Sequence, residues 1–398
     1  MPPQNLRIPG PTPLPDAVRE AGSRQMVAHR GPEFKELVAR VSEGLQPTFR
    51  TSADVMVVTA SGTGGLESAI VSFLSQGDVV LSVSIGVFGD RFPSIAKTYG
   101  ADVTKPAIEW GHAADPEMVR EAIRSMTSAG RSPKAVLLTF NETSTGVTNP
   151  LQQLAAVVHD EAPQALLIVD AISGLGAMPF EMDAWGLDVV VTGSQKSWMV
   201  PPGLAMAAVS ERGWAAAEQA SMPRFYFDLV RHRDALLKRQ TPWTPAVGLF
   251  FQLEASLVLI EAEGLEGIFA RHAACGATAR AGIKAMGLRP FADPAYASDT
   301  VTSIRMPEGA EWSTLSKEML SRGLVLAGGQ ATLSGKIFRI GHLGDVSVGD
   351  IVRAIEVIEE AAIAAAIEVN RGVGAAAARR AGEEHSPVAS AVPATSAV

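Results

Sequence analysis

The sequence contains a single cysteine, Cys275, so the chain cannot form an internal disulfide. Many extracellular proteins depend on disulfides, whereas their absence is typical of the reducing cytoplasm, and we expect this protein there. Cys275 lies in the alanine-rich stretch 271–277, which predicts a helix. We expect a small packing residue at this position rather than a reactive thiol.

Long hydrophobic runs and an excess of basic residues are also missing. No uninterrupted apolar run approaches the roughly 18 residues that a membrane-spanning helix needs. The first residues, Met-Pro-Pro-Gln-Asn, lack the charged and apolar regions of a signal peptide, so none is expected. The chain has 34 basic and 42 acidic residues, a formal net charge of -8, which argues against a general nucleic-acid-binding protein. We therefore expect neither a membrane nor a nucleic acid as a partner.

Apolar residues are abundant instead. Of the 398 residues, 47% are hydrophobic and only 19% are charged, and the mean hydropathy is +0.16. This composition suits a large core, a sheet buried on both faces and a subunit interface. The length is sufficient for two domains.

Short apolar runs alternate with amphipathic stretches between about residues 54 and 210. This alternation predicts an α/β fold in which helices cover both faces of a mainly parallel sheet. The predicted strands lie at 55–59, 79–83, 135–139, 165–169, 189–192 and 205–209. The predicted helices between them lie at 66–74, 92–99, 117–125 and 151–159.

The remaining segments differ in composition. The proline-rich stretch 9–15 cannot form a helix or a central strand, and we expect it to lie extended over a surface. A long apolar helix begins after Pro245 and leads to a smaller α+β unit, while Ala, Ser and Pro after Gly372 predict a weakly packed tail. The predicted segments are an N-terminal arm at 1–15, a large domain at 16–250, a bridging helix at 251–271, a small domain at 272–372 and the tail at 373–398.

Two polar residues follow predicted strands where a parallel sheet collects its functional groups. Asp170 stands at the carboxyl end of the strand at 165–169, and Lys196 follows the apolar run 188–192 and a Gly-Ser turn. The pair suits a pyridine cofactor held as a Schiff base, with the amine on the aldehyde and the acid facing the ring nitrogen. The alternatives are a buried helix cap for Asp170 and a solvated surface amine for Lys196.

A glycine-rich turn follows the strand at 55–59. The stretch Ser61-Gly62-Thr63-Gly64-Gly65 opens a predicted helix, where free backbone N–H groups and hydroxyls form a cup for a phosphate. It is not a P-loop, because no Lys-Ser/Thr follows, and Glu67 stands where a dinucleotide fingerprint has its third glycine. A tight strand-to-helix turn without a ligand is the alternative.

Three further positions carry suitable chemistry. Phe88, between glycines after the strand at 79–83, could lie face-on over a planar cofactor or simply be a core residue. Thr143, in the polar loop 141–146, could reach the edge of such a ring, although an ordinary loop or helix cap would look the same. Arg339, alone in an apolar strand, needs an anionic partner and fits a carboxylate, unless it is paired internally; His342 is expected to be structural.

Together these motifs resemble the class V aminotransferases of fold type I, the pyridoxal-phosphate (PLP) enzymes that include alanine–glyoxylate and serine–glyoxylate (or serine–pyruvate) aminotransferases. The resemblance covers roughly residues 5–370. It rests on Pro-Gly-Pro-Thr at 9–12, Ser-Gly-Thr-Gly at 61–64, Asn-Glu-Thr-Ser-Thr-Gly at 141–146, Val-Asp-Ala-Ile-Ser at 169–173, Gly-Ser-Gln-Lys at 193–196, Pro-Pro-Gly at 201–203 and Arg-Ile-Gly at 339–341. It implies a large domain with a mainly parallel, seven-stranded type of sheet between helices, and a smaller α+β C-terminal domain.

The resemblance also implies a role for each matching residue. Lys196 would bind the cofactor aldehyde and act as general base and acid, and Asp170 would pair with the ring nitrogen. Arg339 would bind the substrate carboxylate, with Gly10 of the arm also facing the substrate. The remaining cofactor contacts would come from Ser61, Gly62, Thr63 and Gln195 at the phosphate, Phe88 over the ring, Thr143 at the ring hydroxyl, and Thr244 from a partner subunit at the phosphate.

Two positions depart from the family pattern. Thr241 stands where the family has a tyrosine that reaches the partner's phosphate, and Phe88 replaces the tryptophan of some members. A phenylalanine at position 88 can still stack on the ring. A threonine at position 241 removes the phosphate contact that the tyrosine would make.

The resemblance implies a transaminase that works by a ping-pong mechanism, with PLP as cofactor, no metal, and a homodimer that shares its active sites. Alanine or serine as amino donor and glyoxylate or pyruvate as acceptor are the substrates it favours. A PLP-dependent lyase of the same fold is a rival, although desulfurases typically stack a histidine on the ring and use a mobile-loop cysteine. A non-catalytic homologue that acts as a binding or assembly subunit is another.

Overall fold

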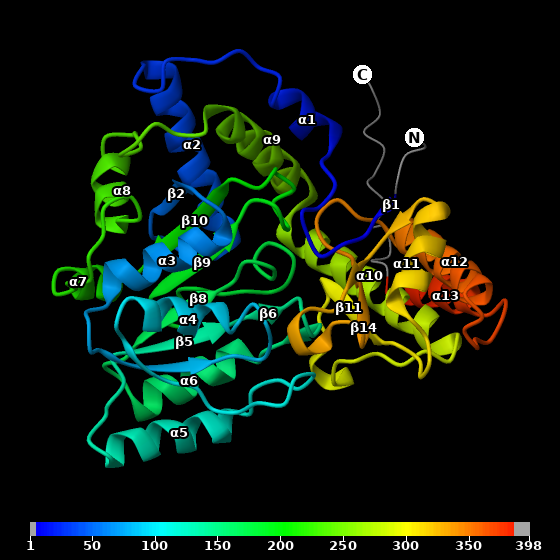
Figure 1. Ribbon diagram of the computed structural model, residues 1–398. Coiled ribbons are helices and arrows are strands. Elements are labelled where there is room, and N and C mark those ends of the chain that lie inside the picture. The colour runs from blue at the N-terminus through cyan, green and yellow to red at the C-terminus, as the bar shows by residue number, and fades with distance from the viewer. Residues whose placement is uncertain (1–4, 386–398) are drawn as a thin grey trace.

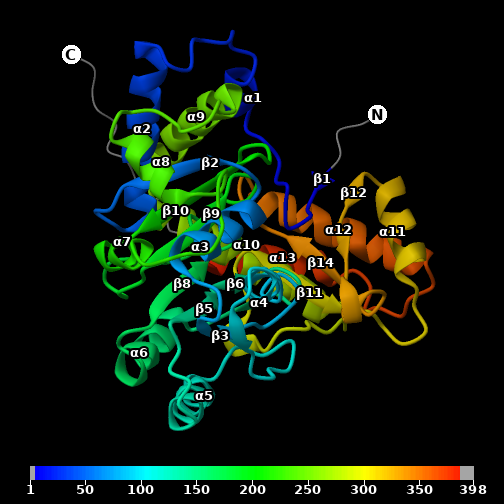
Figure 2. The ribbon, with the colours of Figure 1, turned by 60° about the vertical axis from the view of Figure 1, so that its left-hand side comes forward.

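The computed structural model describes residues 5–385, which form a large and a small part lying side by side (Figures 1 and 2). The large part is built on a seven-stranded sheet whose strand order is β2-β10-β9-β8-β5-β3-β4. All its strands are parallel except β10, which is antiparallel to both of its neighbours. The predicted fold class, a mainly parallel α/β sheet, is confirmed. The strands are β2 (Val55–Thr59), β3 (Val79–Val83), β4 (Asp102–Thr104), β5 (Ala135–Thr139), β8 (Leu166–Asp170), β9 (Val189–Gly193) and β10 (Leu204–Val209).

Helices cover both faces of this sheet because its central strands are apolar on both sides. Along the central strand β5, Val136 and Leu138 belong to one hydrophobic core, and Ala135 and Leu137 belong to the other. The first core packs against α1 (Asp16–Ala21), α2 (Pro32–Phe49), α5 (Pro116–Ser128), α6 (Leu151–Glu161) and α9 (Val247–Glu263). The second packs against α3 (Gly62–Phe73), α4 (Arg91–Thr98), α7 (Glu211–Ala217) and α8 (Leu229–Leu236).

The small part has its own core around a three-stranded antiparallel sheet of order β11-β14-β13. Its main elements are α10 (Leu265–Ala285), β11 (Val301–Arg305), α11 (Trp312–Ser321), β13 (Ala327–Gly328), β14 (Ile337–Gly341), α12 (Val348–Ala364) and α13 (Gly374–His385). The short elements are the strands β1 (Asn5–Leu6) and β12 (Leu324–Val325), which pair in parallel, the hairpin of β6 (Asn141–Glu142) and β7 (Val147–Thr148), and the 3-10 turns η1 (Pro294–Tyr296) and η2 (Ala331–Leu333).

Two helices, not one, connect the parts. The chain turns at Gly264, whose φ of 75° ends α9 and starts α10, so the expectation of one bridging helix at 251–271 is wrong. The other predicted segment boundaries stay predictions. No helix among residues 5–385 is long and apolar enough to cross a membrane.

The prediction of a weakly packed tail is wrong for residues 374–385. They form α13, which packs against α10 and α12 and buries Ala378. A Cβ atom at Gly382 would lie 2.4 Å from Cγ1 of Val348, so the small residue permits this close approach. The rest of the predicted tail, 386–398, lies outside the described residues.

Candidate active site

A cavity of about 400 Å³ opens where the carboxyl ends of the sheet strands meet the small part. Nine of the eleven residues predicted for the site line it, and Arg339 and Thr244 do not. The nine are Gly10, Ser61, Gly62, Thr63, Phe88, Thr143, Asp170, Gln195 and Lys196.

Asp170 is the last residue of β8 and faces this cavity although it is only 4% exposed. Its Oδ1 accepts a hydrogen bond from the Ile172 N–H at 3.0 Å. Burial raises the pKa of this carboxyl to about 7, against the lowering effects of that hydrogen bond and of the Lys196 charge. A buried acid of this kind is best satisfied by a cationic partner inside the cavity.

Lys196 follows β9 and presents its amine to the same cavity, where Nζ donates to the carbonyl oxygen of Pro9. Burial, followed by the positive charge of Arg339, lowers the pKa of this amine to about 8. The amine is therefore partly neutral near physiological pH, which nucleophilic attack on an aldehyde requires. The alternatives of a helix cap and a solvated surface amine do not describe these two side chains.

The N-terminus of α3 forms one end of the cavity. Ser61 precedes the helix with an extended backbone and its side chain makes no capping bond, so the first N–H groups stay free for an anion. A Cβ atom at Gly62 would lie 2.6 Å from Cδ1 of Ile172, so a larger residue at this position would have to displace the Ile172 side chain. Gln195 adds a buried Oε1 atom that has no hydrogen-bond partner among the described residues. The free N–H groups and hydroxyls fit a phosphate group, to which the Gln195 side chain can donate only through its amide NH2 group.

Phe88 and Thr143 line the middle of the cavity. Phe88 is half-buried, and the guanidinium carbon of Arg91 lies 4.7 Å from the centroid of its ring. Thr143 is buried beside Glu142, a fully buried carboxylate that accepts hydrogen bonds from the N–H groups of Gly89 and Ser144 at 2.7 and 2.9 Å. Burial raises the pKa of Glu142.

Arg339 lies in β14 behind the cavity wall. Its Nε and Nη2 donate to the Gly328 carbonyl oxygen at 3.0 and 2.7 Å, and Nη1 donates to the Thr143 carbonyl oxygen at 3.0 Å. Three of the five guanidinium donors are therefore used by backbone oxygens, and two are left for a carboxylate. Within residues 5–385 no acidic side chain forms an ion pair with Arg339, so its binding of an anionic substrate stays a prediction.

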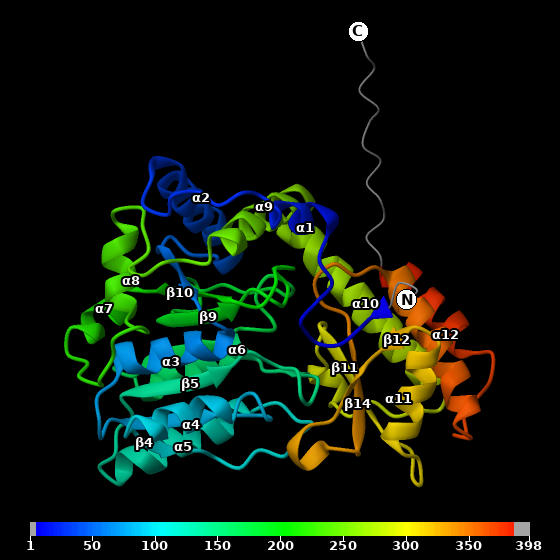
Figure 3. The same cartoon turned by 45° about the horizontal axis from the view of Figure 1, so that its top comes forward.

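The N-terminal arm enters the site, and the expectation that it lies over a surface is wrong for residues 9–12. Figure 3 shows the arm running from β1, beside the small sheet, to α1, which packs on α9. The Thr12 N–H donates to the Gln195 carbonyl oxygen at 3.2 Å, and the Thr12 hydroxyl donates to that of Lys196 at 3.0 Å. Gly10 adopts φ +125°, and a Cβ atom there would lie 2.8 Å from Lys196 Nζ. The arm thus packs directly against the amine.

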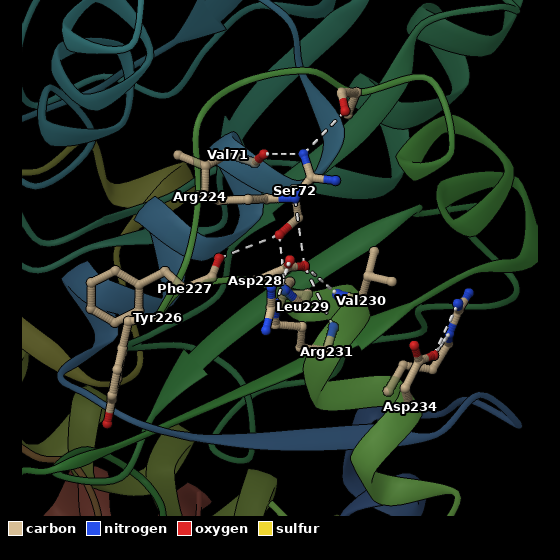
Figure 4. Close-up of polar contacts among 12 residues, drawn as sticks. Val71, Ser72, Arg224, Tyr226, Phe227, Asp228, Leu229, Val230, Arg231 and Asp234 are labelled. Carbon is tan, nitrogen blue, oxygen red and sulfur yellow. Dashed lines mark hydrogen bonds and ion pairs between the residues drawn. The ribbon is translucent and has the colours of Figure 1, made fainter. Parts of the chain in front are cut away.

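Thr244 lies outside this cavity and is exposed. The buried hydroxyl of Thr241 donates to the Trp243 carbonyl oxygen at 2.7 Å, so it is used within its own loop. Trp243 stacks on Phe225 and Tyr226, which are 66% and 39% exposed. In Figure 4, Tyr226 points away from the hydrogen-bonded network that holds its loop, in which Asp228 caps α8.

Several cavity residues were not singled out by the sequence. Asn141, Ile172 and Ser173 follow strand ends and could have been expected from that position alone. Arg91 stands three residues after Phe88 at the start of α4, and Gln330 comes from the small part with no local signal. Within residues 5–385 no group of three or more His, Cys, Asp and Glu side chains is arranged to hold a metal ion.

Comparison with known proteins identifies the family. The model of the family aminotransferase class-V matches residues 12–352. A relative from Synechococcus sp. named soluble hydrogenase, small subunit, is 40% identical over 94% of this chain and 97% of its own. A serine–glyoxylate aminotransferase from Methylorubrum extorquens is 36% identical over 94% of each chain. The solved structure of ureidoglycine–glyoxylate aminotransferase from Bacillus subtilis has a TM-score of 0.89 and 29% identity, over 96% of this chain and 99% of that one. The chain therefore belongs to the class V aminotransferases, a family of PLP-dependent enzymes.

Proposed function

We propose that the protein moves an amino group from a small amino acid, alanine or serine, to a small 2-oxo acid, glyoxylate or pyruvate, by a ping-pong mechanism. The observation that carries this proposal is the pairing of Asp170 and Lys196 in one cavity, each with a pKa moved toward neutrality. The relatives named above that act on glyoxylate support the choice of acceptor. The single cysteine supports a place in the cytoplasm.

When bound, PLP supplies an aldehyde that condenses with amines and a ring that accepts an electron pair from the substrate. Lys196 would hold the aldehyde through its amine and, once freed by the amino group of the donor, its Nζ atom would take the proton from the substrate Cα atom. The same Nζ atom would then carry that proton and give it up again as a general acid. The Asp170 carboxylate would pair with the ring nitrogen and favour its protonated form. In the second half of the cycle these proton transfers run in reverse.

The other side chains of the cavity would bind and orient the cofactor and the substrate. The phosphate would be held at the α3 N-terminus by Ser61, Gly62, Thr63 and Gln195. Phe88 would stack on the ring, and Thr143 would contact the ring hydroxyl. The two free donors of Arg339 bind the substrate carboxylate, and Gly10 allows the arm to close over the amine without filling the space the substrate needs.

We further propose a homodimer in which Thr244 contacts the phosphate of the partner subunit. The exposed aromatic side chains beside it, Phe225 and Tyr226, support an interface on this surface, because exposed apolar patches are typically covered by a partner. Analytical ultracentrifugation tests the assembly, and a monomer with full activity would refute it.

A lyase of the desulfurase type is less well supported. Such an enzyme needs an accessible thiolate, whereas Cys275 is fully buried in α10 and burial raises its pKa to about 12. The residue predicted to stack on the ring is Phe88 rather than a histidine.

A panel of amino donors against glyoxylate and pyruvate tests the proposed reaction. We expect the donor alone to convert the bound cofactor to its amine form, with release of one keto acid per site, and the acceptor alone to reverse the change. Turnover of cysteine to a sulfur species without any acceptor would favour the lyase. Enzyme that takes up no PLP would refute both.

A further inference from the structure

Arg91, the first residue of α4, lies in the active-site cavity without a role in the proposed reaction. Its Nη1 donates to the Thr63 hydroxyl at a long 3.4 Å, and its guanidinium carbon is 4.7 Å from the centroid of the Phe88 ring. Arg91 forms no ion pair with any acid among residues 5–385. The guanidinium is thus held beside Thr63, the second residue of α3, and its charge is not neutralised by an acidic side chain of the described residues.

At the α3 end of the cavity, the other groups present do not neutralise the charge that a bound phosphate would bring. A phosphate monoester carries close to two negative charges at neutral pH, and the α3 N-terminus offsets about half a charge. The side chains expected there, Ser61, Thr63 and Gln195, are neutral. Lys196 and Arg91 are the only lysine and arginine side chains that line the cavity within the described residues, and Lys196 is needed at the aldehyde.

We propose that Arg91 is a cofactor-binding residue that neutralises and holds the PLP phosphate from the α4 side. The planar guanidinium suits two phosphate oxygens, and contact with the Phe88 ring and the Thr63 hydroxyl orients it in advance. This contact compensates for the family tyrosine that Thr241 replaces. The inference rests on the proposed function, since it places the phosphate at the start of α3.

The test compares PLP with pyridoxal, which has the same ring and aldehyde but no phosphate. Apoenzyme is titrated with each compound, and the visible absorbance of the bound aldehyde gives the two dissociation constants. We expect R91Q to weaken PLP binding roughly tenfold to a hundredfold and to leave pyridoxal binding unchanged. R91K should recover part of the loss, because it restores the charge without the planar fork. Inorganic phosphate should compete with PLP more weakly in R91Q than in the wild type.

Lys97 offers a matched control, since it is an exposed cation on the same helix and does not line the cavity. K97Q removes one positive charge from α4 and should leave both dissociation constants unchanged. If R91Q weakens PLP and pyridoxal equally, or weakens neither and instead raises KM for a dicarboxylic amino donor, the inference is wrong. Wild-type protein that takes up neither compound would refute the proposed function as well, whereas normal PLP binding by R91Q would refute this inference alone.

Discussion

Replacing Asp170 with asparagine should stabilise the cofactor-free protein while it abolishes transamination. Burial raises the pKa of Asp170 from 3.8 to about 7, so the ionised carboxylate destabilises the folded apoprotein. At about 1.36 kcal/mol per pKa unit, this shift corresponds to about 4 kcal/mol, an upper bound because water enters the open cavity. The pKa of Asp170 is higher in the folded than in the unfolded protein. The contribution of protonated Asp170 to the free energy of unfolding is therefore complete below pH 3.8 and is lost as the pH rises through 7.

The assay is urea unfolding of the apoproteins at about pH 5 and about pH 8. Asp170→Asn has nearly the same size but no titration, so its advantage over the wild type should grow with pH, to a few kcal/mol at the higher value. Added PLP should reverse the order, since the wild-type carboxylate then gains a cationic partner. A variant that is less stable than the wild-type apoprotein at both pH values, with no dependence on pH, would refute the reasoning.

Three further predictions concern the amine and the substrate contact. Lys196→Ala should abolish turnover while PLP still binds non-covalently; steady-state assays and equilibrium dialysis check this, and retained turnover would contradict the assigned role. Because only a neutral amine attacks the aldehyde, the stopped-flow rate of PLP uptake should rise with pH to a plateau above about 8, whereas a midpoint near the ordinary lysine value of 10.5 would show that the pKa is not lowered. Arg339→Gln should raise KM for the amino donor roughly tenfold to a hundredfold with PLP affinity retained, and an unchanged KM would remove the arginine from the substrate site.

The sheet and the chemistry at its strand ends could be predicted because local patterns determine them. A strand buried on both faces is a continuous apolar run, so β5 and β9 are predicted to within a residue. Parallel strands also bring their carboxyl ends to one edge, which places Asp170 and Lys196 together although 25 residues separate them in the sequence.

Features that depend on distant contacts could not be predicted from local patterns. The arm reaches the site because Thr12 bonds to the backbone of Gln195 and Lys196, and only the family resemblance indicated Gly10 there. Residues 374–385 form a helix because alanine favours one and α10 and α12 offer a surface for it, whereas the composition of the whole tail suggested weak packing. Gln330 enters the cavity from the small part, so only the packing of the two parts places it there.

The central claim is that PLP is bound through Lys196 opposite Asp170. Borohydride reduction of the holoenzyme, followed by proteolysis and mass spectrometry of the peptides, tests it most directly. The account predicts one reduced pyridoxyl group per chain, on the peptide that contains Lys196, and none in Lys196→Ala. A label on another lysine, or no label on enzyme that is active, would contradict it.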